Sequence, residues 1–436
     1  MLFRNATLAD DRTRDVRIED ERIAEIDTDL SPEADERVVD ATDKLLLPGA
    51  IDAHVHFRQP GYEHKETWAS GSKSAAAGGV TTVVDQPNTS PPTVSGEAFD
   101  EKADYARESL VDWGINGGVT AEWDPDSLFS KPVFALGEVF LADSTGNMGI
   151  EADLFADAVE RAAEEDVVVT VHAEDATLFD DSAKERAGDD YDAWSAYRAP
   201  EAEAAAVERA LEVGGDSTAQ IHIAHTSTPE GADLAHDAGA SCEVTPHHLF
   251  LSRDDYDELG TKGRMNPPLR SEERRAGMLE RLLDGTIDIV ATDHAPHTVE
   301  EKDASIWDAP SGVPGVETML PLLLETARAG TLSYERVRDV TAANVAEIFD
   351  LPQKGRVDVG NDADLVLVDP EASREIRGED LHSNCGWTPF EGRRGVFPEL
   401  TLVRGSVVYE RSGEETEQAE RQTEQFGDAA GENVRE

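Results

Sequence analysis

Residues 44–57, KLLLPGAIDAHVHF, carry the pattern that decides how the rest of the chain is interpreted. An apolar run turns through Pro48 and Gly49 into a second apolar run, which is typical of a buried strand that opens a new unit near residue 50. Because side chains alternate along a strand, Asp52, His54 and His56 lie on one face. Both imidazoles could therefore reach one metal ion at the end of that strand.

Seven more strand-like runs follow, separated by amphipathic stretches rich in Ala, Glu and Arg. In chain order the runs are VTTVVDQ, DWGINGGV, VFALGEVF, VVVTVHA, AQIHIAH, ASCEVTP and IDIVATD. Strands that alternate with helices predict a parallel sheet joined by crossover helices. Eight such units favour an α/β fold of the TIM type, a (β/α)₈ barrel, over residues 50–349.

The two ends of the chain differ from this middle part. Residues 1–49 and 350–412 contain short alternating strands and no helical repeat, so we expect them to share one small, discontinuous β-sandwich domain. Residues 413–436 are polar and acidic with almost no apolar periodicity. Such a segment buries too little apolar surface to order itself, so it is predicted to be a disordered tail.

Composition restricts the class of protein. The chain has 436 residues, 39% of them hydrophobic, and no apolar run of the roughly 20 residues that a membrane span requires. Its first residues lack the features of a secretory signal, so a cytoplasmic location is expected. The two cysteines, Cys242 and Cys385, form no CxxC motif, which argues against a disulfide framework and a thiolate zinc site. Any metal ion would be held by histidine and carboxylate.

The formal net charge of −53 at pH 7 is spread along the whole chain. A surface this acidic repels nucleic acid. It also destabilises a compact chain unless salt screens it, which indicates a halophilic source. The expected partner is a small-molecule substrate, with neither nucleic acid nor membrane, and a homo-oligomer remains possible.

Three further polar residues stand at the C-terminal ends of apolar strands, where barrels carry their active sites: His172, His225 and Asp293. Together with His54 and His56 they fit a two-metal site. The alternative for the histidine pair alone is a structural role inside the strand, and the alternative for Asp293 is capping of the next helix.

The remaining histidines are expected outside the ligand set. His222 precedes His225 by three positions and so lies on the opposite face, as a packing residue. His247 and His248 could orient the metal ligands by hydrogen bonds. The last three have no strand-end placement and are expected at the surface or in structural roles: His64, His236 and His382.

A pair of divalent ions would lower the pKa of a shared water, supply hydroxide near neutral pH and polarise an amide carbonyl. Asp293 would then shuttle the proton between the attacking water and the departing nitrogen. This site is therefore predicted to hydrolyse a cyclic amide or to catalyse the reverse reaction.

Longer motifs resemble the dihydroorotases of the amidohydrolase superfamily. The resemblance extends from about residue 44 to 405 and rests on these motifs: DAHVHFRQPGYEHKETWASGSKSAAAGGVTTVVDQPNTSPPT, CEVTPHHLFL, RMNPPLR, ATDHAPHT, APSGVPGVETMLPLLL, KGRVDVGNDADLVLVD and NCGWTPFEGRR. It implies the barrel fold, two divalent metal ions, most simply Zn²⁺, and interconversion of N-carbamoyl-L-aspartate and (S)-dihydroorotate in pyrimidine biosynthesis.

The same resemblance assigns roles by motif. It implies His54, His56, His172, His225 and Asp293 as metal ligands. The substrate-binding residues that it implies are His56, Arg58, Asn88, Asn266, His297, Ser311 and Gly312. Arg58 discriminates between substrates, because its planar guanidinium matches a carboxylate, and relatives that act on allantoin or hydantoins typically lack it. The alternative for Arg58 is an ion pair at the acidic surface.

One position departs from the family pattern. Many members bridge the two ions with a carbamylated lysine, whereas the matching segment here, GEVFLADSTGNMG, has Glu138. A glutamate can bridge two ions directly, so Glu138 is the expected bridge and Asp143 the fallback. The alternative is a site with one metal ion and a Glu138 that faces solvent or an arginine.

Two other classes compete with a dihydroorotase. An allantoinase or hydantoinase would use the same metal site without needing a ring carboxylate. A non-catalytic scaffold would have lost metal ligands, whereas this chain keeps the four histidines and Asp293.

Overall fold

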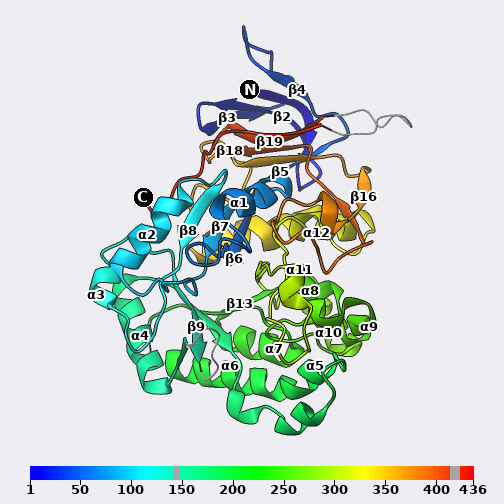
Figure 1. The fold of residues 1–436 in the computed structure, drawn as a ribbon. Coiled ribbons are helices and arrows are strands. Elements are labelled where there is room, and N and C mark those ends of the chain that lie inside the picture. The colour runs from blue at the N-terminus through cyan, green and yellow to red at the C-terminus, as the bar shows by residue number, and fades with distance from the viewer. Residues whose placement is uncertain (142–147, 216, 413–422) are drawn as a thin grey trace.

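The computed structural model describes residues 1–141, 148–215, 217–412 and 423–436. Within these ranges, eight strands form the barrel: β6 (Ala50–Val55), β7 (Val80–Asp85), β8 (Asp112–Ile115), β9 (Leu136–Leu141), β11 (Val169–Ala173), β12 (Ile221–Ile223), β13 (Ser241–Val244) and β14 (Ile289–Val290). They are the eight strands expected from the sequence. The fold is a (β/α)₈ TIM-type barrel with a small β-sandwich domain (Figure 1).

All neighbouring barrel strands pair in parallel. Hydrogen bonds join β6–β7–β8 and β9–β11–β12–β13–β14 as two sheets, and β10 (Gly149–Ile150) adds to β9 outside the ring. Two parallel bridges connect the sheets, Gly117 with Leu136 and Val55 with His294. The second bridge brings the last strand back to the first and so closes the barrel.

The helices have the bounds α1 (Trp68–Ala77), α2 (Gly96–Ala106), α3 (Pro125–Leu128), α4 (Ala152–Glu165), α5 (Ala193–Tyr197), α6 (Pro200–Gly214), α7 (Pro229–Asp237), α8 (Pro246–Phe250), α9 (Tyr256–Leu259), α10 (Glu272–Asp284), α11 (Val299–Lys302), α12 (Met319–Arg328), α13 (Tyr334–Arg338) and α14 (Asn344–Ile348). Hydroxyl side chains that accept a backbone N–H begin several of them, such as Ser95 at α2, Thr228 at α7 and Ser271 at α10. None of the described helices has the length and apolar character of a membrane span.

Strands from both ends of the chain form one nine-stranded sheet beside the barrel: β1 (Leu2–Thr7), β2 (Thr13–Glu19), β3 (Arg22–Asp27), β4 (Val38–Asp40), β5 (Leu45–Pro48), β15 (Leu365–Val368), β18 (Leu400–Val403), β19 (Ser406–Ser412) and β20 (Thr423–Phe426). A short hairpin, β16 (Ser373–Glu375) and β17 (Arg394–Val396), stands apart. β5 pairs with β15, which joins the N-terminal to the C-terminal strands. This pairing supports our proposal that residues 1–49 and 350–412 form one discontinuous domain and 50–349 the barrel.

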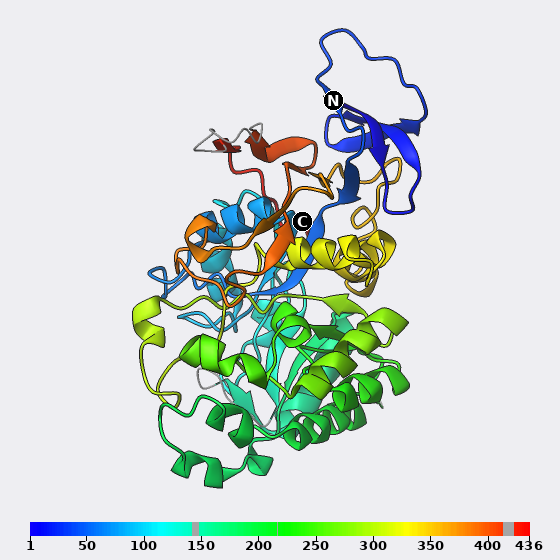
Figure 2. The ribbon, with the colours of Figure 1, turned by 90° about the vertical axis from the view of Figure 1, so that its right-hand side faces the viewer.

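The polypeptide passes from the small domain into the barrel at Pro48 and Gly49. A Cβ on Gly49 would lie 2.1 Å from Oγ1 of Thr81, so only glycine allows this close approach to β7. The small domain has a core of its own, which includes Phe3, Val16 and Leu402. Figure 2 shows the blue N-terminal strands on one side of the barrel and the green helices α5–α7 toward the opposite side.

The prediction of a disordered tail is wrong for residues 423–436, while residues 413–422 lie outside the described part. β20 pairs antiparallel with β19, and Phe426 packs against Tyr409. Farther on, Trp113 N donates to the carbonyl of Glu432 at 2.9 Å, and the Asn433 side chain is buried. This polar segment is ordered by pairing with strands that are distant in sequence, which a local pattern does not show.

The docking of the C-terminal segment depends on Gly431. A Cβ there would lie 2.0 Å from the carbonyl oxygen of Val111. We expect Gly431→Ala to undock residues 429–436 and to lower the free energy of unfolding by about 2 kcal/mol, because several backbone hydrogen bonds are lost. Urea unfolding at high salt and carboxypeptidase sensitivity measure this, with Asp428→Ala, at an exposed site, as the control. Equal stability of both variants would contradict the prediction.

Candidate metal centre and substrate pocket

The predicted metal ligands gather at the C-terminal ends of the barrel strands. His54 lies in β6 and His56 directly follows it, Glu138 lies in β9, His172 lies in β11, and His225 follows β12. Asp293 follows β14. His225 and Asp293 adopt positive φ angles of 32° and 47°, a conformation uncommon for residues with a side chain and concentrated at functional sites.

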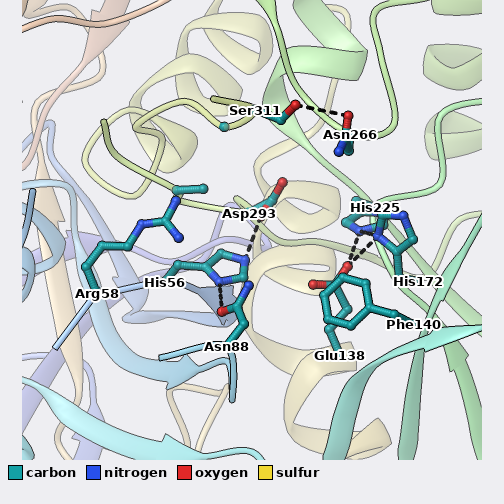
Figure 3. Close-up of a pocket in the computed structure, with 12 residues that line it drawn as sticks. His56, Arg58, Asn88, Glu138, Phe140, His172, His225, Asn266, Asp293 and Ser311 are labelled. Atoms are coloured by element: carbon teal, nitrogen blue, oxygen red, sulfur yellow. Dashed lines mark hydrogen bonds and ion pairs between the residues drawn. The ribbon is translucent and has the colours of Figure 1, made fainter. Parts of the chain in front are cut away.

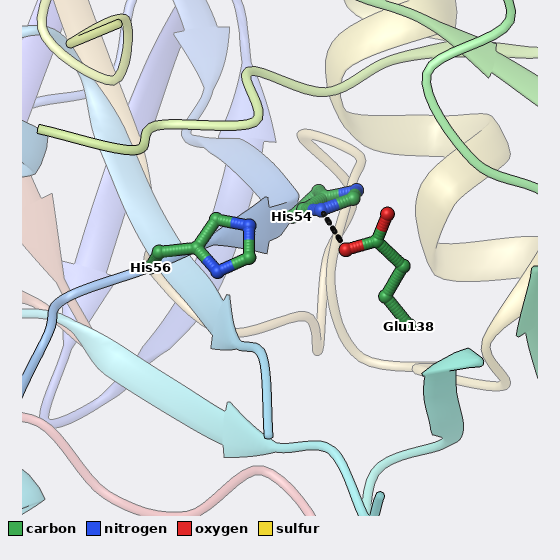
Figure 4. A group of neighbouring side chains, drawn as sticks. All are labelled: His54, His56 and Glu138. Atoms are coloured by element: carbon green, nitrogen blue, oxygen red, sulfur yellow. Dashed lines mark ion pairs between the residues drawn. The ribbon is translucent and has the colours of Figure 1, made fainter. Parts of the chain in front are cut away.

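Two groups of these side chains could each hold a metal ion, and they share Glu138. The first contains His54, His56 and Glu138 (Figure 4), and the second contains Glu138, His172 and His225. Glu138 Oε1 lies 2.7 Å from His172 Nδ1 and 2.5 Å from His225 Nε2, while Oε2 lies 3.6 Å from His54 Nε2. One carboxylate therefore faces both histidine pairs.

The donor set fits divalent cations. His54 Nε2 is buried and has no hydrogen-bond partner among the described residues. A buried polar atom without a partner fits a nitrogen that binds a metal ion. Burial raises the pKa of Glu138, but the imidazoles of His225, His172 and His54 together hold that pKa well below its usual range. The carboxylate is thus an anion in the centre of an imidazole cluster, which suits a metal bridge.

Asp293 borders the first group. Its Oδ1 lies 2.9 Å from His56 Nε2 and 3.6 Å from His54 Nε2. The carboxylate also lines the cavity (Figure 3). Asp293 is therefore within reach both of an ion held by this histidine pair and of a molecule in the cavity.

Side chains behind the candidate ligands form a second layer that orients the imidazoles by hydrogen bonds. Sequence analysis missed the main member of this layer, Glu243. Glu243 Oε1 lies 2.6 Å from His54 Nδ1 and accepts the backbone N–H of His225 at 2.9 Å. Its Oε2 lies 3.2 Å from His222 Nε2, and the carboxylate is buried. The sequence did contain a signal for this role, because Glu243 is an acidic residue inside the otherwise apolar strand ASCEVTP. The view of His222 as a packing residue is incomplete, since its ring supports Glu243.

Other members of this layer hold His172 and His56. Glu174, two residues after His172, places Oε2 3.2 Å from His172 Nε2. Glu174 is itself paired with Arg198. Burial raises the pKa of Glu174, but the Arg198 guanidinium and the His172 ring together lower it to about 2. Asn88 Oδ1 lies 2.7 Å from His56 Nδ1. Carboxylate and amide partners of this kind fix the tautomer and the ring orientation of a metal-binding histidine.

A small cavity opens beside the two groups. Its lining contains most of the predicted site: His56, Arg58, Asn88, Glu138, Phe140, His172, His225, Asn266, Asp293, Ala295, Ser311 and Gly312. Phe140 was not predicted; its ring packs 5.1 Å from that of His172, measured between centroids. An aromatic residue in an apolar strand gives no signal by itself.

Arg58 presents an unpaired charge to this cavity. Its Nε donates to the carbonyl of Pro296 at 3.3 Å, and Nη2 lies 3.2 Å from His297 Nε2. Among the described residues, no carboxylate lies within ion-pair distance of this guanidinium. It is not the surface ion pair considered as the alternative, and a half-buried charge without a carboxylate partner points to an anionic ligand.

Asn266, Ser311 and Gly312 lie together in another part of the lining. Ser311 Oγ donates to Asn266 Oδ1 at 3.1 Å (Figure 3). The backbone N–H of Gly312 donates to the carbonyl of Arg264 at 3.0 Å, so this group is already engaged. Gly312 has a φ of 129°, and a Cβ would lie 2.6 Å from the carbonyl oxygen of Ala295, so this position requires glycine.

The remaining predicted residues lie outside the cavity lining. His297 packs behind Arg58, with Nε2 2.9 Å from the carbonyl of Ser311.

The other histidines lie away from the cavity. His247 is buried beside His248, and burial lowers the pKa of His247 to about 3. His248 contacts Thr245 and the carbonyl of Pro267. His64 is exposed, His236 lies in the last turn of α7, and His382 contacts Glu317 and Glu424. Asp143 falls outside the described residues.

A closed barrel with these histidines and carboxylates at one end defines a cyclic amidohydrolase. The chain matches the Dihydro-orotase-like family over residues 43–230 and the Amidohydrolase family over residues 143–408. It is 70% identical to a dihydroorotase of Halobacterium salinarum over 94% of this chain and 96% of that protein. A dihydroorotase of Methanosarcina acetivorans is 44% identical over 91% and 89%. The chain therefore belongs to the dihydroorotase family.

Solved structures agree on the fold. The L-hydantoinase (dihydropyrimidinase) of Arthrobacter aurescens superimposes with a TM-score of 0.91 at 29% identity, covering 99% of this chain and 98% of that one. The dihydropyrimidinase of Brevibacillus agri gives 0.86 at 30% identity over 93% and 94%. The barrel and its companion domain are thus shared with other cyclic amidohydrolases.

Because Glu243 contacts both halves of the site, its charge should matter for metal binding. We expect Glu243→Gln to weaken divalent metal affinity about 10- to 100-fold, since the His54 tautomer is no longer fixed. Calorimetric titration of metal-free protein with Zn²⁺ measures the change. Glu164→Gln, at a side chain 70% exposed, is the control. An unchanged affinity would show that Glu243 only packs.

Proposed function

We propose that the protein catalyses the reversible cyclisation of N-carbamoyl-L-aspartate to (S)-dihydroorotate, with loss of water, in de novo pyrimidine biosynthesis. The observation that carries this choice of substrate is the unpaired guanidinium of Arg58 at the rim of the cavity. Dihydroorotate has a ring amide for the metal centre and a carboxylate for Arg58. A neutral ring would leave this half-buried charge without a counter-ion.

Arg58 and Asn88 would bind the substrate carboxylate. The amide oxygen of Asn88 is directed to His56 Nδ1, so its amide nitrogen remains as a donor. A guanidinium and an amide can hold both carboxylate oxygens, which fixes the orientation of the ring. Asn266 and the segment 311–312 would contact the ring from elsewhere along the cavity lining.

Two divalent ions, most simply Zn²⁺, are proposed as cofactors. His54, His56 and Asp293 would hold one and His172 and His225 the other, with Glu138 shared between them. Such ions lower the pKa of a coordinated water and polarise a carbonyl. Glu138 would thus take the place of the carbamylated lysine found in many relatives.

Asp293 would move the proton. In ring opening, a water oxygen bonds to the ring amide carbon, the bond from that carbon to nitrogen breaks, and Asp293 transfers a proton from the water to the nitrogen. Ring closure reverses these steps and releases water. The contact of Asp293 with His56 at 2.9 Å would hold its carboxylate beside the reacting bond of a bound substrate.

Beyond its substrate we propose a cytoplasmic protein without nucleic-acid or membrane partners, which could form a homo-oligomer. The net charge of −53 supports the exclusion of nucleic acid.

A hydantoinase is the second candidate, favoured by the TM-score of 0.91 to the Arthrobacter enzyme. Its substrates need no ring carboxylate, so the role of Arg58 separates the two candidates.

Removing the Arg58 charge should therefore damage activity on dihydroorotate. We expect Arg58→Met to lower kcat/KM for L-dihydroorotate about 100-fold, equivalent to roughly 3 kcal/mol, because the charge-assisted contact to the substrate carboxylate is lost. Ring opening followed by absorbance at high salt measures it, and Arg107→Met, at an arginine 76% exposed, should match wild type. If the wild-type protein opened a hydantoin ring and not dihydroorotate, the assignment of dihydroorotate as its substrate would be wrong.

Glu138 should determine the metal content. We expect Glu138→Ala to lose at least one of two metal equivalents together with ring-opening activity, because both imidazole pairs lose their shared carboxylate. Metal analysis after gel filtration gives the stoichiometry, and Glu164→Ala serves as the matched control. Two retained equivalents in the variant would exclude Glu138 as the bridge.

A further inference from the structure

Lys65 lies behind the substrate pocket without lining it. Its Nζ is 3.1 Å from His297 Nδ1 and 3.1 Å from Glu301 Oε1, and the side chain is only 13% exposed. Glu301 is anchored in turn, because its Oε2 accepts the backbone N–H of Thr298 at the start of α11. The ammonium group is thus held at a defined place against the imidazole of His297.

The partners of His297 determine where its ring proton lies. A lysine ammonium only donates, so Nδ1 must accept from Lys65 and carry no proton. The carbonyl of Ser311, 2.9 Å from Nε2, only accepts and so favours a proton on Nε2, whereas the Arg58 guanidinium, 3.2 Å from the same nitrogen, only donates and favours a lone pair there. The tautomer with hydrogen on Nε2 therefore satisfies two hydrogen bonds.

The other tautomer would engage Arg58. With the proton on Nδ1, the lone pair of Nε2 would face Arg58 Nη2, 3.2 Å away, and accept its N–H. It would also set an N–H against the Lys65 ammonium and a lone pair against the Ser311 carbonyl. Lys65 thus disfavours the one arrangement in which His297 would use up a donor of Arg58.

We propose that Lys65 is a positioning residue for substrate binding: by keeping the proton of His297 on Nε2, it leaves the Nη2 donor of Arg58 free for the substrate carboxylate. This inference rests on the proposed role of Arg58. It adds a residue that touches neither the metal ligands nor the cavity.

The charges around His297 support this view. Burial and the nearby positive charges of Arg58, Lys302 and Lys65 hold the pKa of His297 well below its usual range, so the ring stays neutral. A neutral imidazole has two alternative tautomers, and a fixed hydrogen bond to one nitrogen selects between them. Trp387 Nε1 additionally donates to the His297 carbonyl at 2.8 Å and holds the backbone in place.

The test uses ¹⁵N-histidine-labelled, metal-loaded protein and L-dihydroorotate as substrate. In the wild type we expect His297, assigned with His297→Gln, to show a protonated Nε2 and an unprotonated Nδ1. Lys65→Met should shift this pattern toward a protonated Nδ1 and raise KM about tenfold, with kcat within about threefold of wild type. Lys65→Arg, which keeps a donor, should restore the wild-type pattern and most of the affinity.

Two controls separate the tautomer from other effects. Glu301→Gln removes the ion pair of Lys65 and should leave the proton on Nε2, whereas Lys184→Met changes an exposed lysine and should change neither readout. An unchanged His297 pattern in Lys65→Met, or a changed pattern with unchanged KM, would overturn the proposal. Wild-type protein that fails to open dihydroorotate would instead contradict the proposed function, while the ¹⁵N pattern would still test Lys65.

Discussion

The closure of the barrel between β6 and β14 is the constraint on which the site depends. Val55 pairs with His294, and the backbone N–H of His56 donates to the His294 carbonyl at 2.8 Å. This contact joins residues almost 240 positions apart and sets Asp293 beside the β6 histidines. Since all the barrel strands run parallel, their C-terminal ends meet at one rim, and ligands from five strands converge there.

Bringing the ligand side chains to one rim of the barrel does not by itself orient their imidazole rings. Each ring has two nitrogens, and the second layer decides which of them faces the metal centre. Glu243 holds His54, Asn88 holds His56, and Glu174 holds His172. Glu243 also binds the backbone of His225, so one buried carboxylate ties the two halves of the site together. The same logic recurs at the substrate side, where Lys65 and Ser311 surround His297.

The chain as a whole is strongly acidic, whereas the surroundings of the substrate pocket are basic. The chain carries a formal net charge of −53, in keeping with its relative from Halobacterium salinarum, yet the basic side chains of Arg58, Lys65 and Lys302 surround His297 beside the pocket. The buried Nζ of Lys302 donates to the carbonyls of Arg264 and Pro310, which links two segments of the substrate wall. Buried charges are screened far less by salt than surface charges, so such a pocket suits a protein in concentrated salt.

Local patterns were sufficient for the fold and for most of the site. Period-two strands, helical repeats between them and polar residues at strand ends gave all eight barrel strands, and the histidine, Arg58 and Glu138 positions meet around one cavity. These features are visible because strand direction and alternation place side chains without any distant contact.

The sequence by itself determined the barrel, the ligand types and the substitution of glutamate for lysine at position 138. Only the tertiary structure decided that Glu243 and His222 lie behind the candidate ligand histidines, that Lys65 faces His297, and that residues 423–436 are ordered. The physical reason is the same in each case. These residues acquire their partners from segments distant in the chain, and the sequence around such a residue carries no signal of where that partner lies.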